Sequence, residues 1–366
     1  MPSLLHRQAE AGRHRGPHRQ VRAPVRKAQG QVVANASFDP ERRSALLGAK
    51  LAAVAGDVGG ELSTFPGGAA LVEAPSRRAW ILAEDEPAKL LGRGLAWAWA
   101  RDVSRVDLVV EDDAGLLTRR AAQFAVPPTV WWLNGRELHR VEPEPLSPPP
   151  APHSQALALA PVLESAGADV VLEHGVVVGE ILGLEIARVV VDEFGARIEV
   201  GVGRHDREAF ATVHGDLPTE AALAEVIATV RRHRAGAAEG HPLKRLAAER
   251  WLREVVIAHP DMVGAAALDR VQGTRPRTNL KEPVPAAAVG TDVDGRPMVV
   301  VSSVGVDLDL VPTAADVRLA SEPDARLVLA VPERDDVPAT RALAGSLLHP
   351  ADVVALPGNW RAAPLP

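Results

Sequence analysis

Three glutamates in the middle of the chain, Glu180, Glu185 and Glu199, are of a residue type that can hold a divalent metal ion. Glu180 and Glu185 precede or begin an expected strand over residues 183–191, and Glu199 lies on the expected partner strand over 196–202. Carboxylates on neighbouring strands can hold Mg²⁺ or Mn²⁺, which activates water and neutralises a phosphate. The alternative is that polar and apolar residues alternate and place these glutamates on the solvent face of a β-hairpin.

A glycine turn directly after these strands is a candidate phosphate site. Gly201 and Gly203 lie between a strand and an expected helix start, where backbone N–H groups can bind an anion. Arg204 or His205, directly after these glycines, can supply a positive charge to a metal site at the three glutamates. The alternative is an ordinary turn that needs positive φ angles, with His205 as a helix cap.

Charged residues elsewhere have a binding and a structural interpretation. A basic connection can contact phosphate or be a solvated loop; it contains Arg270, Arg275, Arg277 and Lys281. Asp307 and Asp309 are expected on one face of a strand, where they can bind a metal or protect a sheet edge by their charge. Glu249 and Arg253 are expected on the exposed side of an amphipathic helix over 242–257.

The elements around these residues alternate between helix and strand. Hydrophobic periodicity and turn residues predict a helix from about 38, three short strands, and then helix, strand, helix and strand up to residue 133. The stretch 79–133 and the stretch 297–356 show the same order at nearly the same spacing. We therefore expect two copies of one α/β unit, and chance agreement between two generic βαβ stretches is the competing account.

The chain divides at two places. Residues 142–153 are dense in proline, which cannot supply ladder or helix hydrogen bonds, and a second break precedes residue 241. We expect an α/β fold of small mixed sheets flanked by helices, with two related αβββαβ units and a middle α+β segment. The expected parts are a disordered basic tail, a first unit, a linker, the middle segment and a second unit, over residues 1–37, 38–141, 142–153, 154–240 and 241–366.

The αβββαβ order resembles the core of restriction-endonuclease-like domains. That resemblance implies a metal-binding pair of acidic residues followed, two positions after the second, by lysine. The chain departs from this pattern, because none of its five lysines has Asp or Glu two positions before it. The resemblance therefore implies a degenerate active site, and a divergent one is left only at Glu180, Glu185 and Glu199. Mg²⁺ or Mn²⁺ is expected only if that site is active, and no other cofactor is expected.

Composition restricts the remaining classes. The 366 residues include no cysteine, which excludes disulfides, thiolate catalysis and Cys-based metal sites. No apolar run is long enough to span a membrane, so we expect a soluble, cytoplasmic protein without a membrane partner. Residues 1–37 carry a net charge of +6 within a chain of net charge −6. The Ala-, Val-, Arg- and Pro-rich composition resembles that of actinobacterial proteins.

These observations leave three hypotheses of function. The leading one is a non-catalytic or degenerate nuclease-like module that binds a macromolecular partner, either a protein or a nucleic acid. The alternatives are a divergent metal-dependent nuclease at the three glutamates and a small-ligand sensor at the glycine turn. A large exposed apolar or basic patch favours the binding module, and carboxylates that converge on one pocket favour the enzyme.

Overall fold

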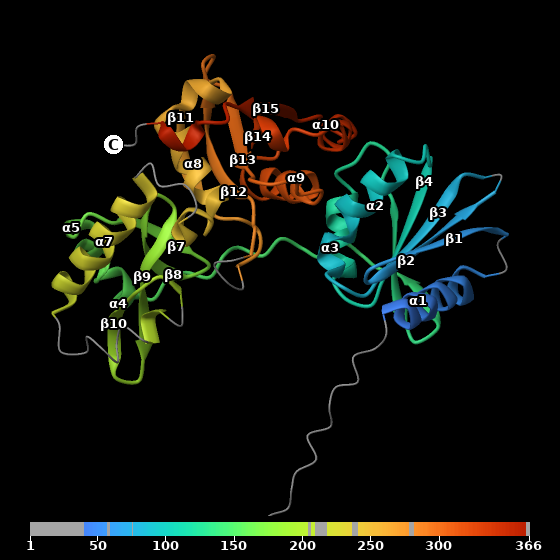
Figure 1. Cartoon of the computed structure of the whole chain (residues 1–366), viewed down its shortest axis with the longest axis horizontal. Helices are drawn as coiled ribbons and strands as arrows, with labels where there is room; N and C mark the ends of the chain where they lie inside the picture. Colours follow the sequence, from blue (N-terminus) through green and yellow to red (C-terminus); the bar gives the residue numbers. More distant parts are fainter. Residues whose placement is uncertain are drawn as a thin grey trace, which may run out of the picture. The chain divides into compact units, whose positions relative to one another are not determined.

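The computed structural model describes residues 40–56, 59–74, 76–203, 206–208, 218–235, 241–277 and 282–363. It shows the expected α/β fold, in which three small sheets are flanked by helices (Figure 1). The predicted disordered tail over 1–37 lies outside the described residues. No helix among those described is long and apolar enough to cross a bilayer.

The first unit contains a six-stranded sheet in the order β1-β2-β3-β4-β5-β6. Strands β3, β4 and β5 run parallel to one another, and the remaining neighbours are antiparallel. The strands are β1 (Gly60–Phe65), β2 (Gly68–Glu73), β3 (Arg78–Ala83), β4 (Arg105–Val110), β5 (Thr129–Asn134) and β6 (Glu137–Arg140). The helices are α1 (Pro40–Ala55), η1 (Pro87–Lys89), α2 (Leu90–Trp99) and α3 (Ala114–Ala121).

Alternation along the strands sorts the side chains of this sheet to two faces. Trp80 and Leu82 of β3 are buried together with Leu47 and Leu51 of α1. Ile81, between them, points to the other face and is buried with residues of α2 and α3. Helix α1 therefore covers one face of the sheet, and α2 and α3 cover the opposite face.

The last unit repeats this strand order and these directions in a five-stranded sheet, β11-β12-β13-β14-β15. Its strands are β11 (Ala265–Val271), β12 (Ala286–Asp292), β13 (Pro297–Ser302), β14 (Arg326–Pro332) and β15 (Asp352–Leu356). Its longer helices are α8 (Ala248–Ala258), which covers one face, and α9 (Leu310–Ser321) and α10 (Pro338–Gly345), which cover the other. Single turns are η2 (Pro242–Lys244), η3 (Pro260–Val263), η4 (Glu333–Asp335) and η5 (Trp360–Ala362).

The helices α2, α3, α9 and α10 bury their apolar side chains in one cluster that reaches both sheets. Gly92 of α2 shows how closely the two units approach. A Cβ atom at this position would lie 2.0 Å from the carbonyl oxygen of Leu308, so a larger residue cannot be accommodated without moving the backbone. The two units therefore share a core.

The middle segment contains an antiparallel sheet in the order β10-β9-β8-β7. Its elements are α4 (Ser154–Leu157), α5 (Ala160–Ser165), β7 (Asp169–Glu173), β8 (Val176–Ile181), β9 (Leu184–Asp192), β10 (Gly195–Val200) and α7 (Thr219–Ala235). Two-residue turns with positive φ at both positions join β7 to β8 and β8 to β9; they are His174-Gly175 and Leu182-Gly183. Sequence analysis missed β8, because neither turn contains the usual Asn-Gly or Asp-Gly pair.

Two sequence expectations are wrong. The expected helix over 242–257 is interrupted at Ala247, whose φ is 47°, and in the helix that follows Glu249 and Arg253 are buried instead of exposed. Asp307 and Asp309 do not lie on a strand. They precede α9, where the backbone N–H of Asp309 donates a hydrogen bond to the Asp307 carboxylate at 2.9 Å.

Candidate functional site

Glu180 and Glu185, two of the predicted catalytic residues, lie opposite each other on the neighbouring strands β8 and β9. Their exposed fractions are 1% and 2%. The interpretation of these two residues as decoration of a solvent-facing hairpin is therefore wrong. Two carboxylates in such a place need compensating charge, because an uncompensated buried charge is expensive.

Arginines from α8 compensate Glu180. Arg250 donates one hydrogen bond to its Oε1 atom, and Arg253 donates another to Oε2 at 3.2 Å. Burial alone would raise the pKa of Glu180, but the guanidinium groups of Arg250 and Arg253, together with the more distant charge of Arg277, outweigh it and hold the pKa below its ordinary value. Glu180 is therefore ionised and fully engaged in ion pairs.

Glu185 and Glu199 have different arginine partners. Arg188 contacts both oxygens of Glu185, at 2.7 and 2.9 Å, and Arg207 donates to Oε1 at 2.8 Å. Glu199 is partly exposed on β10 and accepts a hydrogen bond from Arg197 at 3.0 Å. Arg207 lies between the two glutamates, since its Nε is 3.8 Å from Glu199. The structure thus places Glu180 and Glu185 opposite each other, and the guanidinium group of Arg207 lies between Glu185 and Glu199.

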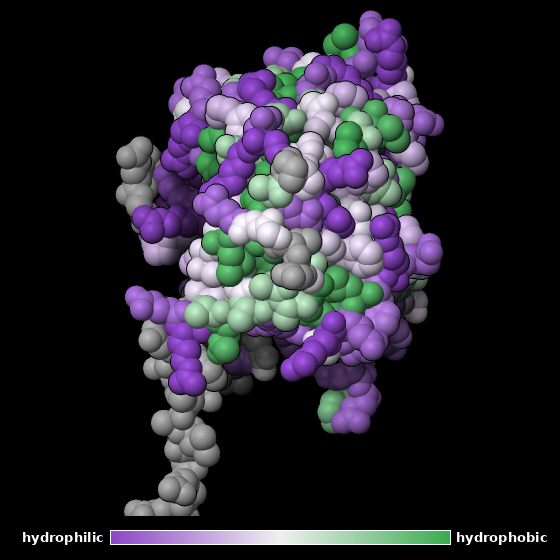
Figure 2. Space-filling view, turned by 90° about the vertical axis from the view of Figure 1, so that its right-hand side faces the viewer, coloured by the Kyte–Doolittle hydropathy of each residue, from purple (hydrophilic) through white to green (hydrophobic). Residues whose placement is uncertain are grey.

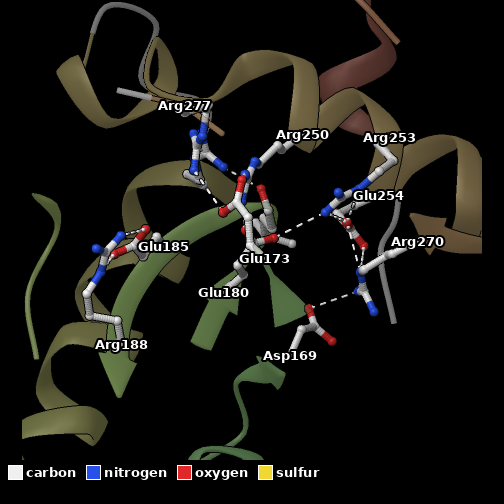
Figure 3. Close-up of polar contacts among 12 residues, drawn as sticks. Asp169, Glu173, Glu180, Glu185, Arg188, Arg250, Arg253, Glu254, Arg270 and Arg277 are labelled. Atoms are coloured by element: carbon white, nitrogen blue, oxygen red, sulfur yellow. Dashed lines mark hydrogen bonds and ion pairs between the residues drawn. The ribbon is translucent and has the colours of Figure 1, made fainter. Parts of the chain in front are cut away.

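Further acidic residues and arginines continue these ion pairs from Glu180 toward the last unit (Figure 3). Glu254 accepts hydrogen bonds from Arg253 at 2.9 and 2.7 Å and from Arg270 of β11 at 2.9 and 3.0 Å. Arg270 also pairs with Asp169 of β7 at 3.2 Å. We call this set the arginine–carboxylate cluster; it comprises Asp169, Glu173, Glu180, Arg250, Arg253, Glu254, Arg270 and Arg277. It joins the middle sheet to α8 and β11.

Guanidinium groups limit the chemistry of this cluster. They keep their protons near neutral pH, so they neither accept protons as bases nor leave the carboxylates free for a metal ion. In the described part of the chain, no group of three or more His, Asp or Glu side chains is placed to hold a metal ion. The arrangement is suited to cross-linking elements and to binding an anion.

Arg234 is a buried arginine that sequence analysis did not single out. Its guanidinium donates hydrogen bonds to the carbonyl oxygens of Leu243 (at 3.1 Å), Leu182 and Leu246, and stacks over the Trp251 ring at 4.8 Å. Burial lowers its pKa to about 9. Arg234 therefore ties the end of α7 to the β8–β9 turn and to the segment before α8.

The glycine turn has a structural explanation. Gly201 has φ +138°, and a Cβ atom there would lie 2.8 Å from the backbone nitrogen of Arg207. Gly203 also has a positive φ, and the N–H of Val202 already donates to the Asp206 carboxylate at 2.7 Å. An acidic side chain thus occupies one amide that a phosphate would use. The predicted binding residues Arg204 and His205 lie outside the described residues.

The predicted basic connection divides into different environments. Arg275 is exposed and pairs with Asp113 at 3.1 Å. The Arg277 side chain is only 8% exposed, and its carboxylate neighbour, Glu173, is 3.9 Å away. A solvated loop therefore describes Arg275 and not Arg277. Lys281 lies outside the described residues.

A groove lies where the first and last units meet, and we call it the interunit groove. It has a volume of about 680 Å³. Side chains at the end of α2 and the segment from Phe124 to Thr129 line one side, and Ala342, Leu343 and Ser346 of the α10 region line the other. Trp99 and Val126 on its wall are 51% and 71% exposed. The groove thus exposes apolar side chains that the fold itself does not cover.

Arginines set the charge of the interunit groove. Arg78 donates two hydrogen bonds to the buried Asp107 carboxylate, at 2.6 and 2.8 Å, so these charges cancel. Arg105 and Arg140 are exposed, and neither forms an ion pair with any described residue; Arg140 stacks over the Trp131 ring at 4.7 Å. The uncompensated charge of the groove is positive.

Comparisons with known proteins identify no relative. No family model, curated protein or solved structure matches this chain. Function is therefore argued from the chemistry of the two sites. The sequence indicated each of the two sites only in part. Arg207 and Arg250 lie far along the chain from the glutamates that they neutralise. The interunit groove is formed by residues more than 200 positions apart in the sequence.

Proposed function

We propose that this protein is a non-catalytic binding module that holds a segment of a macromolecular partner in the interunit groove. The observation that carries the proposal is the exposure of Trp99 and Val126 beside two arginines that have no acidic partner among the described residues. Tryptophan and arginine dominate the residues whose truncation weakens protein interfaces most. Exposed apolar groups of this kind, rimmed by polar residues, typically mark an interaction site.

The charge of the groove favours an acidic protein segment as the partner. Arg105 and Arg140 attract carboxylates, and the apolar wall favours one or two large apolar side chains between them. The basic residues 1–37 of the chain carry the same sign as the groove, so they are a poor occupant. Outside those residues the chain has a net charge of −12, which opposes a long polyanion such as a nucleic acid much more strongly than a short acidic segment.

One side of the molecule is mixed in character. Figure 2 shows the side that faces right in Figure 1, where hydrophobic residues (green) form small groups among hydrophilic ones (purple). Exposed apolar residues scattered in this way need no partner. The interunit groove differs because its apolar residues line a concavity with uncompensated charge.

The nuclease alternative receives less support. Each glutamate that would bind the metal already faces one or two arginines, and Glu180 is completely buried. The resemblance to restriction-endonuclease-like domains stays a prediction, because it rests on the order of elements. A degenerate domain in which ion pairs replace a metal site agrees with the binding proposal.

We also infer that the first and last units are copies of one α/β unit, as the spacing of 79–133 and 297–356 predicts. The shared strand order and strand directions support this inference. So does the placement of α1 and α8 on one face and of the helix pairs on the other. A superposition of β1–β5 on β11–β15 that fits no better than two unrelated mixed sheets would contradict it.

Selection of peptides against the full-length protein tests the binding proposal. A displayed library of random peptides is panned on the wild type, and the enriched peptides are measured by calorimetry. We expect acidic sequences with one or two large apolar residues. Trp99→Ala and Val126→Asp should each weaken their binding at least tenfold, since hot-spot truncations typically cost more than about 1.4 kcal/mol.

The control is Phe194→Ala, which removes the 90% exposed side chain at the tip of the β9–β10 hairpin. This variant should bind the selected peptides as the wild type does. Peptides that bind all three variants with equal affinity, or that are enriched in basic residues, would show that the interunit groove is not the docking site.

A further inference from the structure

A second cavity lies beside the arginine–carboxylate cluster, outside the interunit groove. Its volume is about 340 Å³, within the range of small-ligand sites. Residues 170–173 of β7 form one side, and residues 269–273, 275, 277 and 284–287 of β11, β12 and the chain next to them form the other. Five arginines line it, and we call it the arginine cavity: Arg250, Arg253, Arg270, Arg275 and Arg277.

Four of these arginines have close acidic partners. Arg250 contacts Glu173 and Glu180, and the remaining three pair with carboxylates at 2.5 to 3.2 Å. The fifth, Arg277, differs from them. Its side chain is only 8% exposed, and the one carboxylate oxygen within ion-pair range among the described residues, on Glu173, is 3.9 Å away.

The Nε–H group of Arg277 is also unsatisfied. It is buried and has no hydrogen-bond partner among the described residues. Leaving a buried donor unpaired costs on the order of 1–3 kcal/mol, and more when the group is charged. Native proteins keep few such groups, and binding of an ion or ligand is one of the usual reasons for them.

The electrostatic environment agrees with this geometry. Burial, followed by the neighbouring charge of Arg250, lowers the pKa of Arg277 below its ordinary value, although Glu173 and Glu180 act in the opposite direction. The pKa of Arg250, whose carboxylate contacts are close, is instead raised. Arg277 is thus the under-compensated cation of the cavity.

We infer that the arginine cavity binds a small phosphate ester, with the Nε–H and terminal N–H groups of Arg277 as the principal donors. A phosphoryl oxygen can accept the fork of a guanidinium group and supply the missing negative charge. The cavity has room for more than a phosphate ion, so a small organic group can accompany it. This binding site is separate from the docking function proposed for the interunit groove.

Titration of the full-length protein with inorganic phosphate and with phosphoserine tests this inference. At ligand concentrations about ten times the dissociation constant, we expect the melting temperature to rise by about 2 °C or more. Phosphate also stabilises proteins through exclusion from their surface. The informative quantity is therefore the difference between the wild type and a variant in the same buffer.

In Arg277→Gln, the rise in melting temperature that is due to ligand binding should disappear. Without ligand, the melting temperature of this variant should equal or exceed that of the wild type. Arg277→Lys keeps the charge but loses the fork, and it should bind phosphoserine about tenfold more weakly. The matched control is Arg296→Gln, in the exposed turn between β12 and β13, which should bind as the wild type does.

Three outcomes would overturn the inference. One is an equal rise in melting temperature on addition of ligand in the wild type and in Arg277→Gln. The second is equal binding of acetate and phosphate, which would show that the cavity selects no phosphate. The third is a phosphoserine peptide that binds at least tenfold more tightly than phosphoserine, which would place the phosphate on a protein partner instead of a small ligand.

Discussion

Phe124 pairs with Leu347 in an isolated antiparallel bridge that joins the first and last units. Two backbone hydrogen bonds flank it, from Ala125 N–H to the Ser346 carbonyl at 3.0 Å and from Leu348 N–H to the Gln123 carbonyl at 2.8 Å. Both paired side chains are buried in the cluster shared by the two units. Phe124 lies five positions before the start of β5, and Leu347 lies five positions before the start of β15. The bridge therefore joins corresponding positions of the two units.

This shared core predicts that the two units unfold together. Phe124→Ala and Leu347→Ala should each destabilise the protein by about 3 kcal/mol, through lost burial and the cavity left behind. Calorimetry should show one transition for both units, shifted as a whole in either variant. Phe194→Ala, on an exposed side chain, should leave the transition unchanged. Separate transitions for the two units, with only one of them shifted, would contradict this prediction.

The arginine–carboxylate cluster predicts unequal roles for the candidate glutamates. Glu180→Gln leaves Arg250 and Arg253 without their shared anion and should cost about 3 kcal/mol at pH 7. The partly exposed Glu199→Gln should cost less than about 1 kcal/mol. Because the pKa of Glu180 is lowered in the folded protein, its contribution is present above pH 4.5 and disappears as the pH falls further. Urea midpoints at pH 7 and pH 3 measure both effects.

Metal ions provide the matching test of the nuclease alternative. Millimolar Mg²⁺ or Mn²⁺ should leave the melting temperature of the wild type unchanged, since guanidinium groups already neutralise the glutamates. A rise of several degrees that Glu199→Gln abolishes would instead support a metal site.

The fold class could be predicted because it depends on local patterns. Periodicity and turn residues indicated most helices and strands, and the matched spacing of 79–133 and 297–356 agrees with the common strand order. The strands β6, β8 and β11 were missed. For β8, the turn at Leu182-Gly183 explains the failure, since leucine rarely adopts a positive φ and gave no turn signal.

The sites could be predicted only in part, because their energetics depend on distant partners. Glu180 was recognised as a candidate, but its neutralisation by Arg250 involves a residue 70 positions away. The same applies to Arg234, whose acceptors are backbone carbonyls that no side-chain motif reveals. Alternation in a hairpin suggested an exposed Glu185, whereas its carboxylate is buried against the guanidinium groups of Arg188 and Arg207.

Glu249 predicts a pH-dependent stability. Burial raises its pKa to about 7, and it is 6% exposed. An acid whose pKa is raised on folding favours the folded state when protonated, so stability should fall as the pH rises from about 4.5 to 7. Glu249→Gln should remove this loss and be more stable than the wild type at pH 8, by on the order of 2 kcal/mol. Urea unfolding of the wild type and of Glu249→Gln from pH 4 to 8 measures this difference, and Glu225→Gln, at an exposed position, is the control. The prediction is contradicted if Glu249→Gln is no more stable than the wild type at pH 8.

Two aspartates that share Arg120 should respond to pH in opposite ways. Asp316 accepts hydrogen bonds from Arg119 at 2.8 and 3.1 Å and from Arg120 at 3.3 Å, and these contacts overcome its burial and lower its pKa. Asp309 accepts one from Arg120 at 2.9 Å, yet burial raises its pKa to about 6. The ionised form of Asp316 therefore stabilises the fold, and that of Asp309 does not.

The matched variants are Asp316→Asn and Asp309→Asn, compared by urea unfolding at pH 4 and pH 8. Asp316→Asn leaves Arg119 and Arg120 under-compensated and should cost about 3 kcal/mol at pH 8, with a smaller cost at pH 4, where the advantage of the ionised form is declining. Asp309→Asn keeps an oxygen for Arg120 and avoids a buried charge, so it should match or exceed the wild type at pH 8 and lose that advantage at pH 4. Equal losses in both variants at pH 8 would show that Asp309 is held as firmly as Asp316, and that burial does not outweigh the pairing with Arg120.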